Sequence, residues 1–276
     1  MSRGGEKNQG LLIWKINIYN RFNLLGQVAI TTGISFGLAN LIAVTAAVKT
    51  GWTSTPGSIL GIYAAILVSH CIINTFGVKI LRYLNNASIL LHSVGVTALS
   101  IAVLAKAPTH QSAIFVFSTF YDGTAATSGD VGWSVRASPA YVACCGALLA
   151  QYTLTGFDAS AHLSEETQNA SWSAPIGVIT SVGFSALFGF FVIMAFLFSI
   201  QNFANTVNPP VGQPILQILV DVFGENGAIV LFTLIMVCVW HCGLFSLTSN
   251  SRMMFAFSRD HGIVRLTYSP YYGSKY

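Results

Sequence analysis

The chain has 276 residues, of which 53% are hydrophobic and only 8% are charged. A soluble domain usually carries roughly 25% charged residues, so this composition excludes an ordinary water-soluble protein. The mean hydropathy of +0.64 fits a chain surrounded by a lipid bilayer. The net charge of +4 is spread along the sequence without a basic cluster, and we therefore expect no nucleic-acid partner.

A helix needs about 20 apolar residues to cross a bilayer core of about 30 Å, and six stretches of the sequence meet that length. We therefore predict an all-α fold, a polytopic transmembrane helix bundle of about six spans. Gly26, Gly33 and Gly37 in the first span suit the close helix packing that holds helices together in lipid. The predicted spans are Phe22–Ala47, Gly57–Phe76, Ala87–Ala105, Pro139–Asp158, Ala174–Ile200 and Gly227–Asn250.

The distribution of basic residues predicts the orientation, because cytoplasmic loops carry an excess of Lys and Arg. With the N-terminus inside, ten of the 13 Lys and Arg residues fall on the cytoplasmic side. We therefore expect both termini in the cytoplasm. Residues 1–21 would form a cytoplasmic N-terminal segment, 22–250 the membrane bundle and 251–276 a cytoplasmic tail. The membrane is either the plasma membrane or that of an internal organelle.

Two long connections, Lys106–Ser138 and Gln201–Asn226, are expected on the outside. The second contains an apolar run, Ile215–Val220, that is too short to span and predicts an interfacial or re-entrant helix. The segment Leu11–Arg21 mixes apolar residues with Lys and Arg. It is interpreted either as a helix along the inner membrane surface or as a disordered segment.

The segment Thr153–Thr167 is the most informative for chemistry. An apolar helix reaches Gly156 and then meets Asp158 and further ionisable residues, and a charge near the membrane interior normally faces a cavity or a partner. Helices broken at membrane depth hold the charged groups of substrates in secondary transporters. An equal alternative is a helix that ends at Gly156 and leaves the acidic residues in a cytoplasmic loop. The candidates for gating near the inner mouth, which could equally be solvated loop residues, are His162, Glu165 and Glu166.

Other polar residues suggest less specific roles. His70 and His92 lie within predicted spans, where hydrogen bonding to a neighbouring helix is a more frequent role than proton relay. The five cysteines lie in apolar stretches without the spacing of a zinc site. We therefore expect neither a metal nor a cofactor. A membrane enzyme is the weaker hypothesis, because Asp158 and His162 form the only close acid–histidine pair and lie at a helix end.

Several motifs resemble one transporter family. The run Gly156–Ala170, followed by Ala174–Pro175, closely resembles a motif of the fungal amino-acid/choline permeases, which include permeases for γ-aminobutyrate. These belong to the amino acid–polyamine–organocation superfamily. Phe22–Gln27 with Thr31–Gly37 looks like the third helix of that family, and Ser251–Gly262 looks like the pattern that closes its eighth helix. The resemblance covers about Phe22 to Gly262.

The resemblance implies a fold and a function. The six spans would correspond to helices three to eight of a twelve-helix transporter with a five-plus-five inverted repeat. The chain would then be a secondary active permease, coupled to protons, for amino acids, γ-aminobutyrate, choline or polyamines. Gly156, Phe157 and Asp158 would lie at the sixth-helix break beside the substrate. The other residues that the resemblance places along the pathway are Gln27, Thr31, Ser35, His241, Ser246 and Ser249.

The sequence also departs from the family pattern. The glycine-rich first helix should precede Phe22 by about two spans, and the last four helices should follow Gly262; neither set is present. We therefore expect a truncated product or an incomplete gene model, in which half of the substrate site is missing. The alternative function is that of a non-transporting fragment or regulatory membrane subunit that binds full-length copies.

Overall fold

The computed structural model describes residues 3–123, 132–135, 137–164 and 167–259, and their side chains except those of residues 3–20, 134 and 149–153. Every regular element in this described part is helical, as predicted. The elements are α1 (Arg3–Thr50), α2 (Pro56–Phe76), α3 (Val78–Leu90), the π-helical turn η1 (Leu91–Gly95), α4 (Val96–Lys106), α5 (Ala113–Ser118), the 3₁₀ turn η2 (Trp133–Val135), α6 (Pro139–Thr153), α7 (Ala159–His162), α8 (Ala170–Phe198), α9 (Phe203–Val207) and α10 (Pro214–Arg259).

Five helical stretches in the described part are long and apolar enough to cross a membrane. They match five of the six predicted spans, with α3, η1 and α4 forming one of them. The remaining prediction, a full-length span over Pro139–Asp158, is wrong in length. Its helix, α6, has 15 residues and at 1.5 Å per residue rises only about 22 Å. The five stretches are Arg21–Thr50, Pro56–Phe76, Val78–Lys106, Ala170–Phe198 and Pro214–Arg259.

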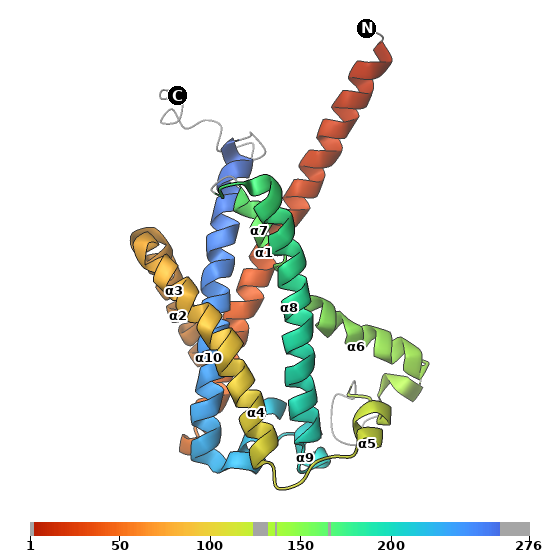
Figure 1. Ribbon diagram of the computed structural model, residues 1–276, viewed down its shortest axis with the longest axis vertical. Coiled ribbons are helices and arrows are strands. Elements are labelled where there is room, and N and C mark those ends of the chain that lie inside the picture. Colours follow the sequence, from red (N-terminus) through yellow and green to blue (C-terminus); the bar gives the residue numbers. More distant parts are fainter. Residues whose placement is uncertain (1–2, 124–131, 136, 165–166, 260–276) are drawn as a thin grey trace.

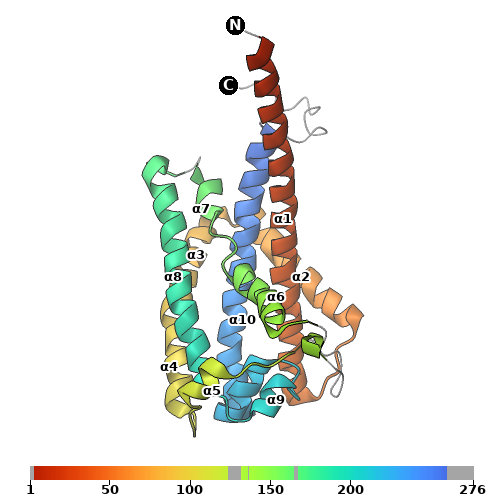
Figure 2. The same cartoon turned by 90° about the vertical axis from the view of Figure 1, so that its right-hand side faces the viewer.

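The short α6 lies between the two ends of the bundle. In Figure 1, α5 lies near one end of the bundle and α7 near the other, and the chain travels between them along α6 and the turn that follows it. α6 itself is inclined to the upright helices. As a result, the start of α1 and the end of α10 lie at the same end of the bundle (Figure 2). The location of both termini on the cytoplasmic side stays a prediction.

The N-terminal segment is part of a longer helix. Leu11–Arg21 belongs to α1, which runs without interruption from Arg3 to Thr50, so neither a separate surface helix nor a disordered segment forms there. In Figure 2 this part of α1 projects beyond the bundle. Helix α10 likewise continues through residue 250 to Arg259. Neither predicted boundary of the membrane bundle is therefore the end of a helix.

Helix α10 is two helices joined by a kink. Gly224 has φ 73° and ψ 171°, a conformation that is essentially restricted to glycine. The first part, from Pro214, contains the run Ile215–Val220 that was predicted to form a short helix. Leu216 and Leu219 are fully buried, because this part packs into an apolar cluster with Val103 and Phe232. The short helix is therefore held by protein contacts.

α1 and α10 run side by side through the bundle, and the larger buried cluster lies among α4, the end of α8 and α10. Leu38 and Ala39 of α1 pack with Ile66 of α2 in one buried cluster. The outer surfaces are strongly apolar: Leu187 and Ile179 of α8, for example, are 66% and 71% exposed. Lipid tails are as apolar as these side chains. The exposed apolar surface is therefore what a membrane-embedded bundle requires.

Candidate functional site

Both alternatives for the segment Thr153–Thr167 require the helix to end near Gly156, and it does. α6 ends at Thr153 and α7 begins at Ala159. Gly156 has φ 91°, a conformation that a residue with a β-carbon rarely adopts. The carbonyl of Asp158 then accepts hydrogen bonds from the backbone N–H groups of Ala161 and His162. Glycine thus ends one helix and allows the chain to turn before the next helix starts.

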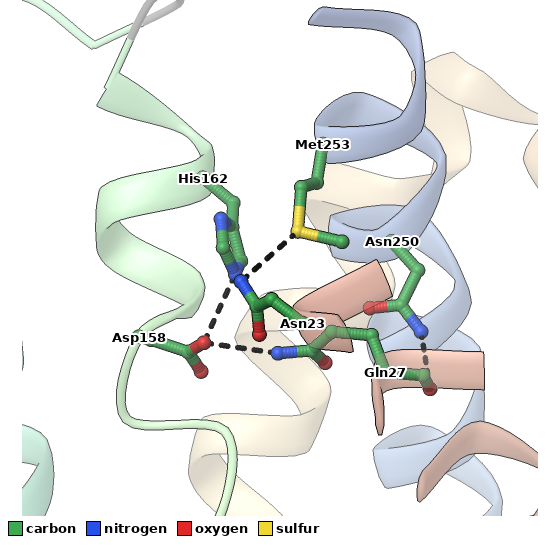
Figure 3. Close-up of polar contacts among 6 residues, drawn as sticks. All are labelled: Asn23, Gln27, Asp158, His162, Asn250 and Met253. Atoms are coloured by element: carbon green, nitrogen blue, oxygen red, sulfur yellow. Dashed lines mark hydrogen bonds and ion pairs between the residues drawn. The ribbon is translucent and has the colours of Figure 1, made fainter. Parts of the chain in front are cut away.

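The turn brings the Asp158 carboxylate to α1 (Figure 3). Its Oδ2 accepts a hydrogen bond from Gln27 Nε2 at 2.9 Å and lies 3.0 Å from His162 Nε2. The Asp158 side chain is 30% exposed and that of His162 13%. Neither partner carries a permanent charge, so the carboxylate keeps its attraction for a cation. Asp158 is therefore tied to α1 and is not free in a loop, whereas Glu165 and Glu166, which the alternative also places in a cytoplasmic loop, lie outside the described residues.

A set of four polar side chains fixes Gln27 between α1 and α10; we call Gln27, Thr31, Ser246 and Asn250 the polar seam. Asn250 Nδ2 donates to the Gln27 carbonyl at 2.9 Å and to Thr31 Oγ1 at 2.5 Å. Thr31 Oγ1 also lies 3.1 Å from the Gln27 carbonyl and 2.7 Å from Ser246 Oγ. Hydrogen bonds between helices replace water as partners in a membrane. The seam therefore fixes the Gln27 backbone against α10 and leaves its side-chain amide to bond Asp158.

The other side of the break faces α8 across a small recess. Residues Leu154 to Phe157 line it from the turn, and Ser181, Val182 and Ser185 line it from α8. The recess therefore combines the exposed backbone of the turn with two hydroxyl groups. The break thus presents its backbone to α8 and its carboxylate to α1.

The structure places the remaining predicted residues in different surroundings. Ser35 is completely buried one turn beyond Thr31, and its Oγ has no partner in the described part of the chain. His241 is 5% exposed, and its Nδ1 lies 2.8 Å from the carbonyl of Val237 in its own helix. Ser249 is 6% exposed in α10. The gating candidates Glu165 and Glu166 lie outside the described residues, whereas His162 contacts Asp158.

The sequence analysis did not identify Asn250 or the pair Asn23–Met253. Asn250 makes both bonds that hold Gln27 and Thr31, and Asn23 Nδ2 lies 3.6 Å from the sulfur of Met253 (Figure 3). A signal for Asn250 existed, because it follows Ser246 by four residues and therefore shares its helix face. Asparagine within an apolar helix is also a common interhelical hydrogen-bonding residue.

The described residues contain no group of three His, Cys, Asp or Glu side chains that could hold a metal ion. The site is therefore built from one carboxylate, amides, hydroxyls, an imidazole and exposed backbone. These groups can bind a solute that carries a cationic nitrogen and a hydrogen-bonding acceptor.

The fold and the site together define a class: a multi-pass helical membrane protein with a helix broken beside a half-buried carboxylate. Comparison with known proteins then gives the family. The family model for amino acid permeases matches residues 1–270, and the chain belongs to this family. No solved structure matches the chain.

Several curated permeases are similar to the chain. A protein from Oryza sativa subsp. japonica, the amino-acid permease BAT1 homolog, is 36% identical over 87% of the chain and 47% of its own length. Amino-acid permease BAT1 from Arabidopsis thaliana is 34% identical over 87% of the chain and 48% of its own length. The GABA-specific permease of Saccharomyces cerevisiae is 29% identical over 92% of the chain and 44% of its own length. The chain thus spans about half the length of these relatives.

Proposed function

We propose that the protein containing this chain is a secondary active transporter that carries amino acids or related organic nitrogen compounds, coupled to protons. One observation carries the proposal: the Asp158 carboxylate stands at a helix break, between the Gln27 amide of α1 and the His162 ring of α7. The family supports amino-acid transport in general. The particular substrates and the coupling ion are part of the proposal.

The chemistry of Asp158 suggests how a substrate binds. Amino acids, γ-aminobutyrate, choline and polyamines share a cationic nitrogen, which a carboxylate attracts. The backbone of the Leu154–Phe157 turn, at the recess against α8, would hold the carboxylate of an amino acid through its N–H groups. Substrate binding would replace the Gln27 bond to Asp158, so substrate and the polar seam would compete for one carboxylate.

The transport cycle follows from this placement. The bundle would rock about the fixed site and open alternately to each side of the membrane. His162, Glu165 and Glu166 are proposed to act in gating at the inner mouth, and Ser35, Ser249 and His241 to line the pathway. Asp158 and His241 are proton-binding candidates from the sequence. We place both termini in the cytoplasm and the protein in the plasma membrane or an organelle membrane.

The experiment is uptake of labelled amino acids by the longest product of the gene in a transport-deficient host. Asp158→Asn keeps the shape of the side chain and removes its charge, and Glu225→Gln, at an exposed residue of α10, is the matched control. Gly156→Leu places a β-carbon on a backbone with φ 91°, which strains the turn. Gly146→Leu is the matched control, because it adds the same side chain in open space within α6. We expect Asp158→Asn and Gly156→Leu to lose uptake, and the controls Glu225→Gln and Gly146→Leu to keep it. Unchanged uptake in both would refute the site.

A further inference from the structure

His70 of α2 is a buried ionisable residue without a visible role. It is 0% exposed, and neither Nδ1 nor Nε2 has a hydrogen-bond partner in the part of the chain that the structure describes. The ring lies against the backbone of Trp240 in the neighbouring helix α10, so a hydrogen-bonding role between helices stays a prediction. His92, in contrast, is exposed and bonds the Ser88 carbonyl of its own helix at 2.8 Å. A buried polar group without a partner is costly and in native proteins calls for a functional or solvent explanation.

A second unpartnered group faces the same place. Ser35 Oγ of α1 is completely buried and also lacks a partner among the described residues. Both groups converge on Gly243 of α10: a β-carbon at this glycine would lie 2.7 Å from His70 Cε1 and 3.4 Å from Ser35 Oγ. Glycine thus lets two helices bring polar side chains against the backbone of a third. The convergence of two unsatisfied groups marks a built polar junction between α1, α2 and α10.

The junction offers partners to a protonated ring. The His70 and Trp240 rings have centroids 5.3 Å apart, which is within the range for attraction between a cation and an aromatic face. An added ring N–H could bond to Ser35 Oγ, directly or through a water molecule. Ser35 also continues the helix face that carries Gln27 and Thr31, since these three residues are spaced by four. The junction is therefore continuous with the polar seam that leads to Asp158.

The three helices carry no competing charge near the junction. Between residues 22–48, 56–76 and 226–251 the sequence contains no Asp, Glu, Lys or Arg. Within these stretches a proton on His70 would therefore meet dipoles, the Trp240 ring and water, with no charged side chain. Helix α3, which also contacts α2 and α10, carries Lys79, Arg82 and Tyr83. The ionisable groups in these stretches besides His70 are Tyr63, Cys71, Cys238, His241 and Cys242.

We propose that His70 is the residue that binds the coupled proton. This inference rests on the proposed function, proton-coupled transport, and names the residue that binds the coupled proton. When the junction opens toward one side of the membrane, the lone pair of one ring nitrogen takes a proton from a hydronium ion, whose O–H bond breaks to leave water. When the junction opens to the other side, that N–H bond breaks and a water molecule there takes the proton as hydronium. Because the charged ring needs an open junction or its polar partners, proton binding and helix movement are linked.

A transport experiment separates coupling from substrate binding. The longest product of the gene, reconstituted in liposomes, is assayed for uphill uptake and for exchange of labelled against unlabelled amino acid. A gradient of one pH unit can support about tenfold accumulation for each coupled proton. We expect His70→Gln to abolish this accumulation while exchange continues, because exchange needs no net proton movement. His92→Gln, the same change at an exposed histidine, should keep both activities. Accumulation by His70→Gln equal to that of the unsubstituted protein overturns the proposal.

A spectroscopic experiment tests proton binding without transport. The 276-residue chain labelled with ¹⁵N-histidine is placed in lipid nanodiscs and titrated between about pH 5 and pH 8, where histidine changes charge. The His70 signal is identified by its loss in His70→Gln. If that variant does not fold, replacement of the other five of the six histidines leaves the signal alone. We expect the signal to titrate and to shift in Ser35→Ala; a ring that stays neutral throughout overturns the proposal.

The two experiments distinguish the possible failures. If the unsubstituted protein neither accumulates nor exchanges any amino acid, the proposed function fails, and the titration alone decides whether His70 binds a proton. If the protein exchanges and accumulates amino acids without dependence on the proton gradient, the transport function is supported and the proposed proton site is refuted. Accumulation that depends on protons but survives in His70→Gln moves the coupling site to another residue.

Discussion

The bond between Gln27 and Asp158 joins α1 to the helix break, and its strength can be measured directly. A double-mutant cycle of Gln27→Ala and Asp158→Ala isolates the energy of the pair from the other effects of each substitution. The donor is 7% exposed and the distance is 2.9 Å, which describes a well-made hydrogen bond to a carboxylate. Such bonds contribute about 1.5–3 kcal/mol in proteins generally.

Two features lower the expected value. The Asp158 side chain is 30% exposed, so water partly replaces Gln27 when the bond is lost. Measured pairs between membrane helices average about 0.6 kcal/mol and reach about 1.7 kcal/mol. We therefore expect a coupling free energy of about 1 kcal/mol. The assay is reversible unfolding of the chain in mixed micelles, followed by circular dichroism.

A second interhelical pair provides the control. Lys49 Nζ donates to Asn226 Oδ1 at 3.0 Å, at an exposed position where water competes freely, and its cycle should show no measurable coupling. If the Gln27–Asp158 cycle gives the same coupling as this exposed pair, the two residues are not joined at the break and the described site is incorrect.

Three further predictions concern the backbone and the orientation. Gly243→Ala should destabilise the chain by about 1–3 kcal/mol through overpacking against His70, seen as a lower thermal midpoint, whereas Gly37→Ala, in open space, should leave it equal or higher. Gly224→Ala should also destabilise, by about 1–3 kcal/mol, because its φ is 73°; a midpoint equal to that of Gly37→Ala would argue against the kink. Asn169, in a glycosylation sequon on the predicted cytoplasmic side, should remain unglycosylated in microsomes. A glycan on Asn169 would show that the predicted orientation is incorrect.

The helical content and the position of the break could be predicted from sequence because both follow from local chemistry. Apolar length predicts spans, and Gly156 followed closely by Asp158 marks a place where a continuous helix is unfavourable. The length of α6 was not predictable in the same way. The apolar pattern continues past Thr153, but the chain turns there, so composition alone overestimates the helix.

The contacts of the site depend on how distant helices face one another. Asn250 bonds the Gln27 carbonyl across 223 residues of sequence, and only the rotation of α1 against α10 brings the two together. Thr31 and Ser246 could be chosen as pathway residues by resemblance, but their direct contact could not be read from the chain. The burial of His70 shows the same limit. A histidine in an apolar helix suggests a partner on a neighbouring helix, but the sequence does not show that Gly243 of α10 lies against its ring.

The most direct test of the central claim is a cryo-electron-microscopy structure of the longest gene product in lipid with a transported amino acid bound. We expect substrate density against the backbone of residues 154–157, with its cationic nitrogen at Asp158 and the Gln27 bond displaced. A substrate bound elsewhere, with Asp158 still paired to Gln27, would contradict the assignment of the helix break as the binding site.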